Sequence, residues 1–170
     1  MQLHLSLDPA PAPRRATFSP CRRYRYRLEQ GWGSGGRVLF VLLNPSTADE
    51  LNDDPTVRRC WTFAADWGYG RADVCNLFAW RGTDPRSMLA AEEPVGPEND
   101  FHLLAAAAQA SLIVCGWGVH GAHRGRAAAV TALLRGAGHT LYALGLTRDG
   151  QPRHPLYLRR QAAPASFGGA

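Results

Sequence analysis

Lysine is absent from this sequence, in which all 19 basic residues are arginine. The absence excludes two kinds of site, the lysine of a phosphate-binding P-loop and a catalytic lysine that forms a Schiff base. Arginine can still bind a phosphate group through two parallel hydrogen bonds. With a net charge of +5, the composition is compatible with an anionic partner such as nucleic acid.

Long apolar runs and closely spaced cysteines are missing as well. No segment approaches the roughly 20 apolar residues of a membrane span, and the first residues lack the charged start and apolar core of a signal peptide. We therefore expect a cytoplasmic protein without a membrane partner. The four cysteines contain no C-x-x-C pair, so we expect no metal site, and no cofactor is implied.

The apolar run at residues 38–43 predicts a strand buried on both faces, as in a parallel sheet covered by helices. The run stops at Asn44, Pro45 and Ser46. Ligands of open α/β sheets bind beyond the carboxyl ends of the strands, so this loop is the first candidate site. The alternative is an ordinary strand exit in which Asn44 caps a turn.

Strands and helices alternate along the rest of the chain. Further buried strands are predicted at residues 72–78, 112–115 and 140–144. Helices are predicted from residue 55 to Gly68 or Gly70, and at 85–91, 98–110 and 122–135. This alternation indicates a three-layer α/β/α sandwich around a four-stranded, mainly parallel sheet. We expect an irregular arm over residues 1–20, a single α/β domain over 21–160 and a disordered tail over 161–170.

Arginine recurs at two places that suit an anion. Within residues 22–29 it alternates with tyrosine and leucine, which predicts a half-buried edge strand with a basic outer face. Arg124 and Arg126 stand at the predicted start of a helix, where backbone N–H groups also favour anions. We expect these two side chains to bind phosphate.

Polar or aromatic residues lie at or after the end of each predicted buried strand: Asn44, Asn76, Trp117 and His154. An asparagine side chain carries both a donor and an acceptor, so it can read the edge of a nucleobase. A neutral histidine can donate to an oxygen that gains charge in a transition state. Phe78 and Trp117 offer aromatic faces on which a base can stack.

Three aspartates, Asp49, Asp53 and Asp54, follow Asn44 closely, and one of them could act as a general base. Asp54 is better explained as the N-cap of the helix that begins at Pro55. Aspartates in polar loops are usually ionised and solvated.

Five motifs along the chain are specific in combination: NPSTAD, DPTVRRC, NLFAWR, CGWG and HPLYL, in that order. Through them the sequence resembles a bacterial and phage family known as domain of unknown function 1643. The resemblance covers residues 21–158, nearly the whole chain. It implies no assigned activity.

A more distant resemblance is to the uracil-DNA glycosylase superfamily, whose members have a four-stranded parallel sheet between helices. Residues 42–45, LLNP, are similar to the G-I-N-P motif of the mismatch-specific branch, without its glycine. His154 and Pro155 are similar to the start of the H-P-S motif, with Leu156 in place of serine. The resemblance implies that Asn44 holds the attacking water, Asn76 recognises the base edge and His154 stabilises charge on the departing base.

The resemblance therefore implies hydrolysis of the N-glycosidic bond of a damaged or modified base in DNA, without strand cleavage by a lysine. The expected catalytic residues are Asn44 and His154, and the expected base-binding residues are Pro45, Ser46, Asn76, Phe78 and Trp117. Two alternatives stay open. One is a non-catalytic nucleic-acid-binding module, and the other is a hydrolase of a small nucleoside or nucleotide metabolite.

Overall fold

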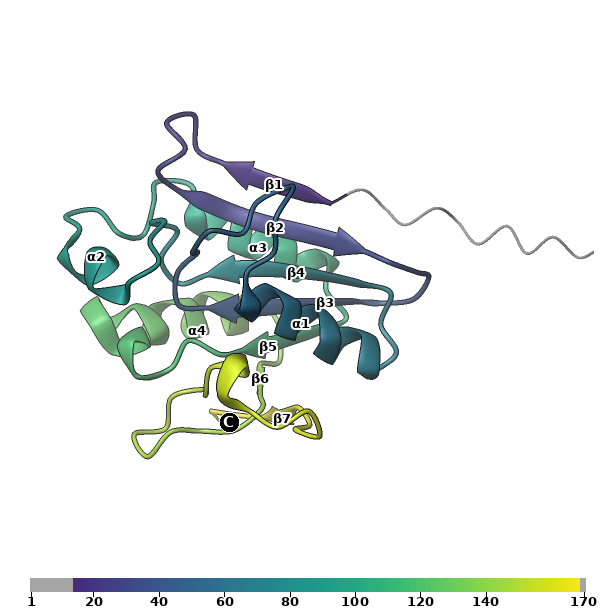
Figure 1. Cartoon of the computed structure of the whole chain (residues 1–170). Coiled ribbons are helices and arrows are strands. Elements are labelled where there is room, and N and C mark those ends of the chain that lie inside the picture. The colour runs from purple at the N-terminus through teal and green to yellow at the C-terminus, as the bar shows by residue number, and fades with distance from the viewer. Residues whose placement is uncertain (1–13, 169–170) are drawn as a thin grey trace, which may run out of the picture.

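A mixed β-sheet runs through the middle of the protein (Figure 1). The computed structural model describes residues 14–168, and within them the sheet has seven strands. They are β1 (Arg15–Phe18), β2 (Arg25–Gly31), β3 (Arg37–Leu42), β4 (Arg71–Asn76), β5 (Leu112–Cys115), β6 (Tyr142–Ala143) and β7 (Ala165–Ser166). Their order across the sheet is β1-β2-β4-β3-β5-β6-β7.

The centre of the sheet is parallel and its margins are antiparallel. Strand β3 pairs in parallel with β4 on one side and β5 on the other, and β5 pairs in parallel with β6. Strands β1, β2 and β7 pair antiparallel to their neighbours. The α/β class is as predicted, whereas the four-stranded sheet was wrong, because main-chain pairing at both margins extends it to seven strands within the described residues.

Strand order reverses at β3, since the next two strands along the chain, β4 and β5, lie on opposite sides of it in the sheet. Such a reversal opens a crevice beyond the carboxyl ends of the two diverging strands, and ligands of open α/β sheets bind there. Strands β3 and β5 flank this point. The topology thus favours a site just beyond residues 42 and 115.

Residues 14–168 contain four α-helices, α1 (Pro55–Asp66), α2 (Pro85–Ala90), α3 (Asn99–Gln109) and α4 (Arg126–Gly136). Two 3-10 helices, η1 (Val119–Gly125) and η2 (Pro155–Tyr157), complete the helical elements of this range. The predicted starts of α1 and α2 are confirmed. Asp54 accepts the Val57 N–H at 2.8 Å and Asp84 accepts the Arg86 N–H at 2.9 Å, and each is followed by a proline.

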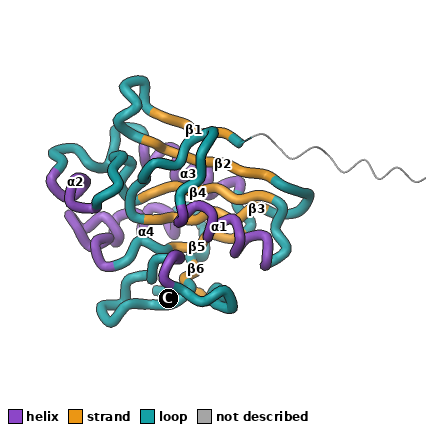
Figure 2. Tube along the Cα trace, in the orientation of Figure 1, coloured by secondary structure: helices purple, strands orange, loops and turns teal. Residues whose placement is uncertain are grey.

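Helices cover both faces of the sheet (Figure 2). Val38 and Phe40 of β3 pack with Phe63 of α1 on one face, while Leu39 of the same strand packs with Leu103 of α3 on the other. Helix α4 joins α3 on this second face. Strand β3 is therefore apolar without interruption because both of its faces are buried.

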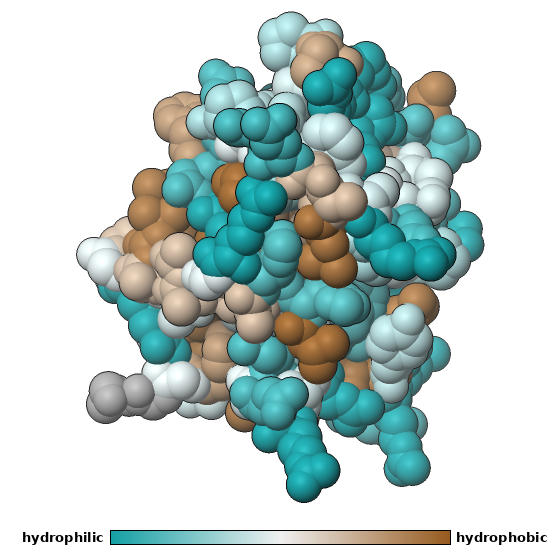
Figure 3. All heavy atoms as spheres, turned by 90° about the vertical axis from the view of Figure 1, so that its left-hand side faces the viewer, coloured by the Kyte–Doolittle hydropathy of each residue, from teal (hydrophilic) through white to brown (hydrophobic). Residues whose placement is uncertain are grey.

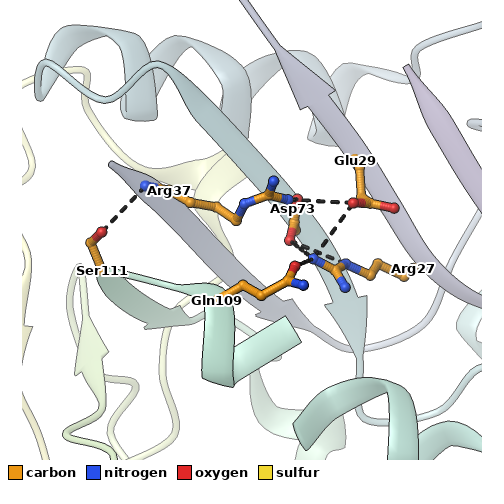
Figure 4. A network of polar contacts seen from close by, with 6 residues as sticks. All are labelled: Arg27, Glu29, Arg37, Asp73, Gln109 and Ser111. Carbon is orange, nitrogen blue, oxygen red and sulfur yellow. Dashed lines mark hydrogen bonds and ion pairs between the residues drawn. The ribbon is translucent and has the colours of Figure 1, made fainter. Parts of the chain in front are cut away.

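The predicted basic outer face of residues 22–29 was wrong, because the arginines of β2 point into the protein. Arg27 is only 8% exposed, and its guanidinium lies 2.6 Å from the carboxylate of Asp73 on β4. Arg37 reaches the other oxygen of Asp73 at 2.7 Å, and Glu29 and Gln109 complete the network (Figure 4). Burial raises the pKa of Asp73, and the two guanidinium groups act in the opposite direction. Strand β2 also lies inside the sheet, since β1 covers its outer edge.

Two segments that were expected to be irregular contain short strands. The arm contributes β1, which pairs with β2, and the tail contributes β7, which pairs with β6. Neither segment has a marked period, and each is held by main-chain bonds to a neighbouring strand. Residues 1–13 and 169–170 lie outside the described part of the chain. No helix within residues 14–168 is both long and apolar enough to cross a membrane.

Candidate functional site

A cavity of about 690 Å³ lies beyond the carboxyl ends of β3 and β5, where strand order reverses. Its walls come from the exit of β3, the start of α1, the segment before α2, the start of η1 and the region of η2. The lining residues that bear on chemistry are Asn44, Ser46, Asp54, Trp117, His154 and Tyr157. Of the predicted site residues, the cavity thus brings together Asn44, Ser46, Trp117 and His154.

Asn44 links two segments of the cavity wall through hydrogen bonds from its amide nitrogen. Its Nδ2 donates to the carbonyl oxygens of Pro45 at 3.2 Å and Gly82 at 3.1 Å, and more weakly to that of Trp80 at 3.4 Å. These bonds tie the exit of β3 to the segment before α2. Among the described residues, none donates to Asn44 Oδ1, so this oxygen is left to accept from a ligand or a water molecule.

Asp54, the predicted N-cap of α1, also lies in the cavity wall. Its Oδ1 caps α1 by accepting the Val57 N–H, yet the same residue lines the cavity. No donor in the described part of the chain reaches its second oxygen, Oδ2. This position of Asp54 could have been predicted from the sequence, because an Asp-Pro helix start shortly after a candidate ligand loop places a carboxylate close to that loop.

His154 directly precedes η2 and lines the same cavity as Asp54, from which it is far removed in the sequence. Its Nδ1 accepts the Leu156 N–H at 3.3 Å, so a neutral ring carries its proton on Nε2 and can donate from there. Burial lowers the pKa of His154, and the carboxylate of Asp54 partly offsets this effect. The imidazole is therefore neutral at pH 7.

Aromatic and aliphatic side chains form the apolar part of the cavity. Trp117 is 2% exposed and fixed in place, since its Nε1 donates to Gln151 Oε1 at 2.7 Å. Val119, Leu156 and Tyr157 are large apolar side chains that stay exposed, with Tyr157 at 75%. Figure 3 views the molecule from the edge at which β3 and β4 end, and shows hydrophobic side chains lying among hydrophilic ones. A flat heterocycle suits walls of this kind.

Three of the predicted base-binding residues lie outside the cavity walls. Asn76 is 1% exposed, and its Oδ1 accepts from the buried guanidinium of Arg25 at 3.4 Å. Phe78 is fully buried in the core, where its ring lies 5.7 Å from that of His123. Pro45 is buried too, and its carbonyl oxygen accepts from Asn44. The prediction that these residues line the base pocket is corrected, because their side chains or carbonyls satisfy partners inside the protein.

The two predicted phosphate-binding arginines are committed to internal partners as well. Arg124 donates to the carbonyl oxygens of Ala91 and Glu92, and its backbone has a positive φ of 53°. Arg126 is 8% exposed and pairs with Asp100 at 2.5 Å. Helix α4 begins only at Arg126, so Arg124 precedes it. Neither residue lines the cavity, and the expected phosphate site at this helix start is corrected accordingly.

Comparison with known families matches residues 25–156 to the family described as "Protein of unknown function (DUF1643)". The chain belongs to the DUF1643 family. All of the cavity-lining residues except Tyr157 fall within the matched range. Neither a curated protein nor a solved structure matches the chain.

Three of the four cysteines of this DUF1643 protein, Cys60, Cys75 and Cys115, are buried. Within residues 14–168, no group of three or more histidine, cysteine, aspartate or glutamate side chains is placed to hold a metal ion. Burial raises the pKa of Cys75 to about 12 and raises those of Cys60 and Cys115 as well. These three thiols therefore stay protonated at neutral pH and are poor nucleophiles.

Proposed function

We propose that the cavity beyond β3 and β5 binds a nucleobase and hydrolyses the N-glycosidic bond that joins the base to its sugar, with a damaged or modified base in DNA as the substrate. The observation that carries the proposal is that Asn44, Asp54 and His154 line one cavity. An amide oxygen can orient water, a carboxylate can take its proton, and an imidazole N–H can stabilise the leaving base.

The reaction forms one bond and breaks one. The oxygen of a water molecule bonds to the anomeric carbon of the sugar while the bond from that carbon to the base nitrogen breaks. The bonding electrons leave with the base, which then takes up a proton from solvent. Asn44 Oδ1 accepts one hydrogen of the attacking water, and Asp54 Oδ2 accepts the proton that the water loses. The products are the free base and a sugar with a new hydroxyl group.

His154 acts on the leaving group. Its Nε2–H donates to an oxygen of the base on which negative charge develops as the bond breaks. A preorganised donor of this kind typically contributes about 2.7–4 kcal/mol to the stability of the transition state. Because burial lowers the pKa of His154, it performs this task as a neutral donor across the physiological pH range.

The size and walls of the cavity support a base-sized ligand. Small-molecule sites occupy roughly 300–1,000 Å³ and are mostly apolar with a few placed polar groups. This cavity, at about 690 Å³, falls in that range. Trp117 provides a buried aromatic wall and Tyr157 an exposed ring at the mouth.

We also propose a finer assignment of the fold. Strands β4, β3, β5 and β6, with α1 on one face and α3 and α4 on the other, correspond to the four-stranded, three-layer core of the uracil-DNA glycosylase superfamily. The parallel pairing of these strands and the helices on both faces support the correspondence.

A mass-spectrometric screen for released bases, over damaged and modified DNA and free nucleosides, tests the proposed reaction. Asp54→Asn keeps the N-cap of α1, since asparagine and aspartate cap equally well, but removes the carboxylate. Asp84→Asn is the matched control, because Asp84 caps α2 in the same way and does not line the cavity.

We expect the wild-type protein and Asp84→Asn to release a base from at least one substrate, and Asp54→Asn to lose that activity while retaining its thermal stability. Two results would overturn the proposal. One is that wild-type protein releases no base from any substrate. The other is that Asp54→Asn releases base as fast as Asp84→Asn.

A further inference from the structure

A cluster of arginines on aromatic rings lies outside the cavity and has no part in the reaction described above. It comprises Arg22, Arg23 and Arg81 with the rings of Phe18 and Trp80, and we name it the arginine ridge. The guanidinium carbons of Arg22 and Arg81 lie 4.0 and 4.6 Å from the centroid of the Phe18 ring. That of Arg23 lies 5.5 Å from the Trp80 ring. Two aromatic rings thus hold three positive groups in place.

The arginine ridge adjoins the cavity. Arg81 directly precedes Gly82, which lines the cavity, and Asn44 Nδ2 donates to the carbonyl oxygens on both sides of Arg81, those of Trp80 and Gly82. In Figure 1 strands β1, β3 and β4 end on the left-hand side, where β2 begins. The turn between β1 and β2, which carries Arg22, therefore lies at the same edge of the sheet as the cavity.

The positive charge of the arginine ridge is only weakly compensated. Within residues 14–168, its single ion pair joins Arg22 to Glu50 at 4.0 Å, and the Arg22 side chain is 55% exposed. Arg22 also has a φ of 56°, a left-handed conformation that is uncommon for a residue other than glycine. Strained backbone of this kind persists where the surrounding structure fixes it, and here it fixes the position of an exposed cation.

We propose that the arginine ridge binds the phosphodiester backbone of a nucleic-acid strand, one base of which enters the cavity; this inference rests on the proposed function. Arginine grips phosphate oxygens through two parallel hydrogen bonds, and stacking on a ring fixes the plane of the guanidinium in advance. A positively charged surface beside aromatic side chains is typical of proteins that bind single strands, and the exposed ring of Tyr157 lines the adjoining cavity. The substrate would then be a polynucleotide rather than a free nucleoside.

The test measures binding of a fluorescein-labelled single-stranded oligothymidylate by fluorescence anisotropy over a series of sodium chloride concentrations. The ridge variant is Arg22→Asn with Arg23→Gln, because asparagine tolerates the left-handed backbone at position 22. The control is Arg15→Gln with Arg71→Gln. Both control arginines are exposed and begin β1 and β4, at the opposite edge of the sheet, and the change in net charge is the same.

Each phosphate contact on a single strand contributes about 0.7 to the slope of log affinity against log salt concentration. We expect the ridge variant to bind more weakly and its slope to fall by about 1.4, for two contacts, while the control pair keeps the wild-type slope. Thermal unfolding of both variants shows whether they are folded. The ridge proposal is wrong if wild-type protein fails to bind, if the ridge variant keeps the wild-type slope, or if both variants lose the same amount.

Base release, measured on the same proteins, separates this inference from the proposed function. If no base is released but binding depends on Arg22 and Arg23, the reaction is wrong and the arginine ridge stands. If base is released while the ridge variant binds and reacts as the wild type does, the arginine ridge is wrong and the reaction stands.

Discussion

The amide nitrogen of Asn44 donates to the carbonyl oxygen of Gly82 over 3.1 Å and so joins the end of β3 to the segment that precedes α2. The same nitrogen serves Pro45 and Trp80, which means that Asn44 is as much a structural residue as a candidate for catalysis. A loss of activity in Asn44→Ala therefore needs a measurement of stability beside it.

Replacing Asn44 tests this structural role. Asn44→Ala leaves partly buried carbonyl oxygens without their donor, and we expect it to cost about 1–3 kcal/mol in the free energy of unfolding. Asn44→Asp is expected to lower the free energy of unfolding further at any pH at which the new carboxyl group is ionised, because a carboxylate then faces those carbonyl oxygens. Urea denaturation at pH 7 measures both variants. Equal stability of Asn44→Asp and the wild type would contradict the bonding pattern described for Nδ2.

The pH dependence of stability tests the environment of His154. Burial lowers its pKa in the folded protein below the ordinary value of about 6.5, so the unfolded chain takes up a proton first as the pH falls. The contribution of His154 to stability is therefore fully present above pH 6.5, roughly, and is lost as the pH falls below that value toward the folded pKa.

His154→Asn removes this titration but keeps an acceptor for the Leu156 N–H. We expect the free energy of unfolding of the variant to decrease less than that of the wild type over this acidic range. Denaturant unfolding at a series of pH values gives the comparison. A variant that follows the wild-type curve throughout would show that His154 is not buried as described.

Asp73 tests the network that crosses the sheet. It is fully buried between Arg27 and Arg37, so Asp73→Asn removes the shorter ion pair of each guanidinium group and leaves only the longer pairs to Glu29. We expect a loss of about 3–5 kcal/mol in the free energy of unfolding. The control is Asp66→Asn, which breaks the exposed pair with Arg160 and should cost much less. Similar losses in the two variants would contradict the importance of the buried network.

Local patterns in the sequence predicted the parts of the fold that depend on near neighbours. The uninterrupted apolar run of β3 indicated burial on both faces, and Asp54 followed by Pro55 marked the start of α1. The edge of the sheet that carries the candidate site could also be predicted, because polar residues follow the ends of strands that run the same way. These inferences use positions within a few residues of one another.

Side-chain partners far along the chain could not be predicted in this way. The alternation along residues 22–29 predicts that Arg25 and Arg27 share one outer face. In the structure both are buried and reach opposite sides of the sheet, since Arg27 contacts Asp73 and Gln109 of α3, whereas Arg25 contacts Ala48, which packs with α1. Arg126 stands at a helix start as expected, yet Asp100 of α3 draws its guanidinium inward. A local charge pattern thus leaves open whether solvent or a partner from a remote segment meets each side chain.

Occupation of the cavity by a nucleobase is the claim on which the account depends most. A ¹H–¹⁵N NMR titration with nucleoside 5′-monophosphates follows it through the indole N–H of Trp117, which lines the cavity, and that of Trp32, which donates to the Tyr69 carbonyl oxygen at 2.9 Å and lies outside the cavity walls. We expect at least one nucleotide to shift the Trp117 resonance in a saturable manner and to leave that of Trp32 unchanged. A Trp117 resonance that stays in place with every nucleotide, or a Trp32 resonance that moves as far, would contradict it.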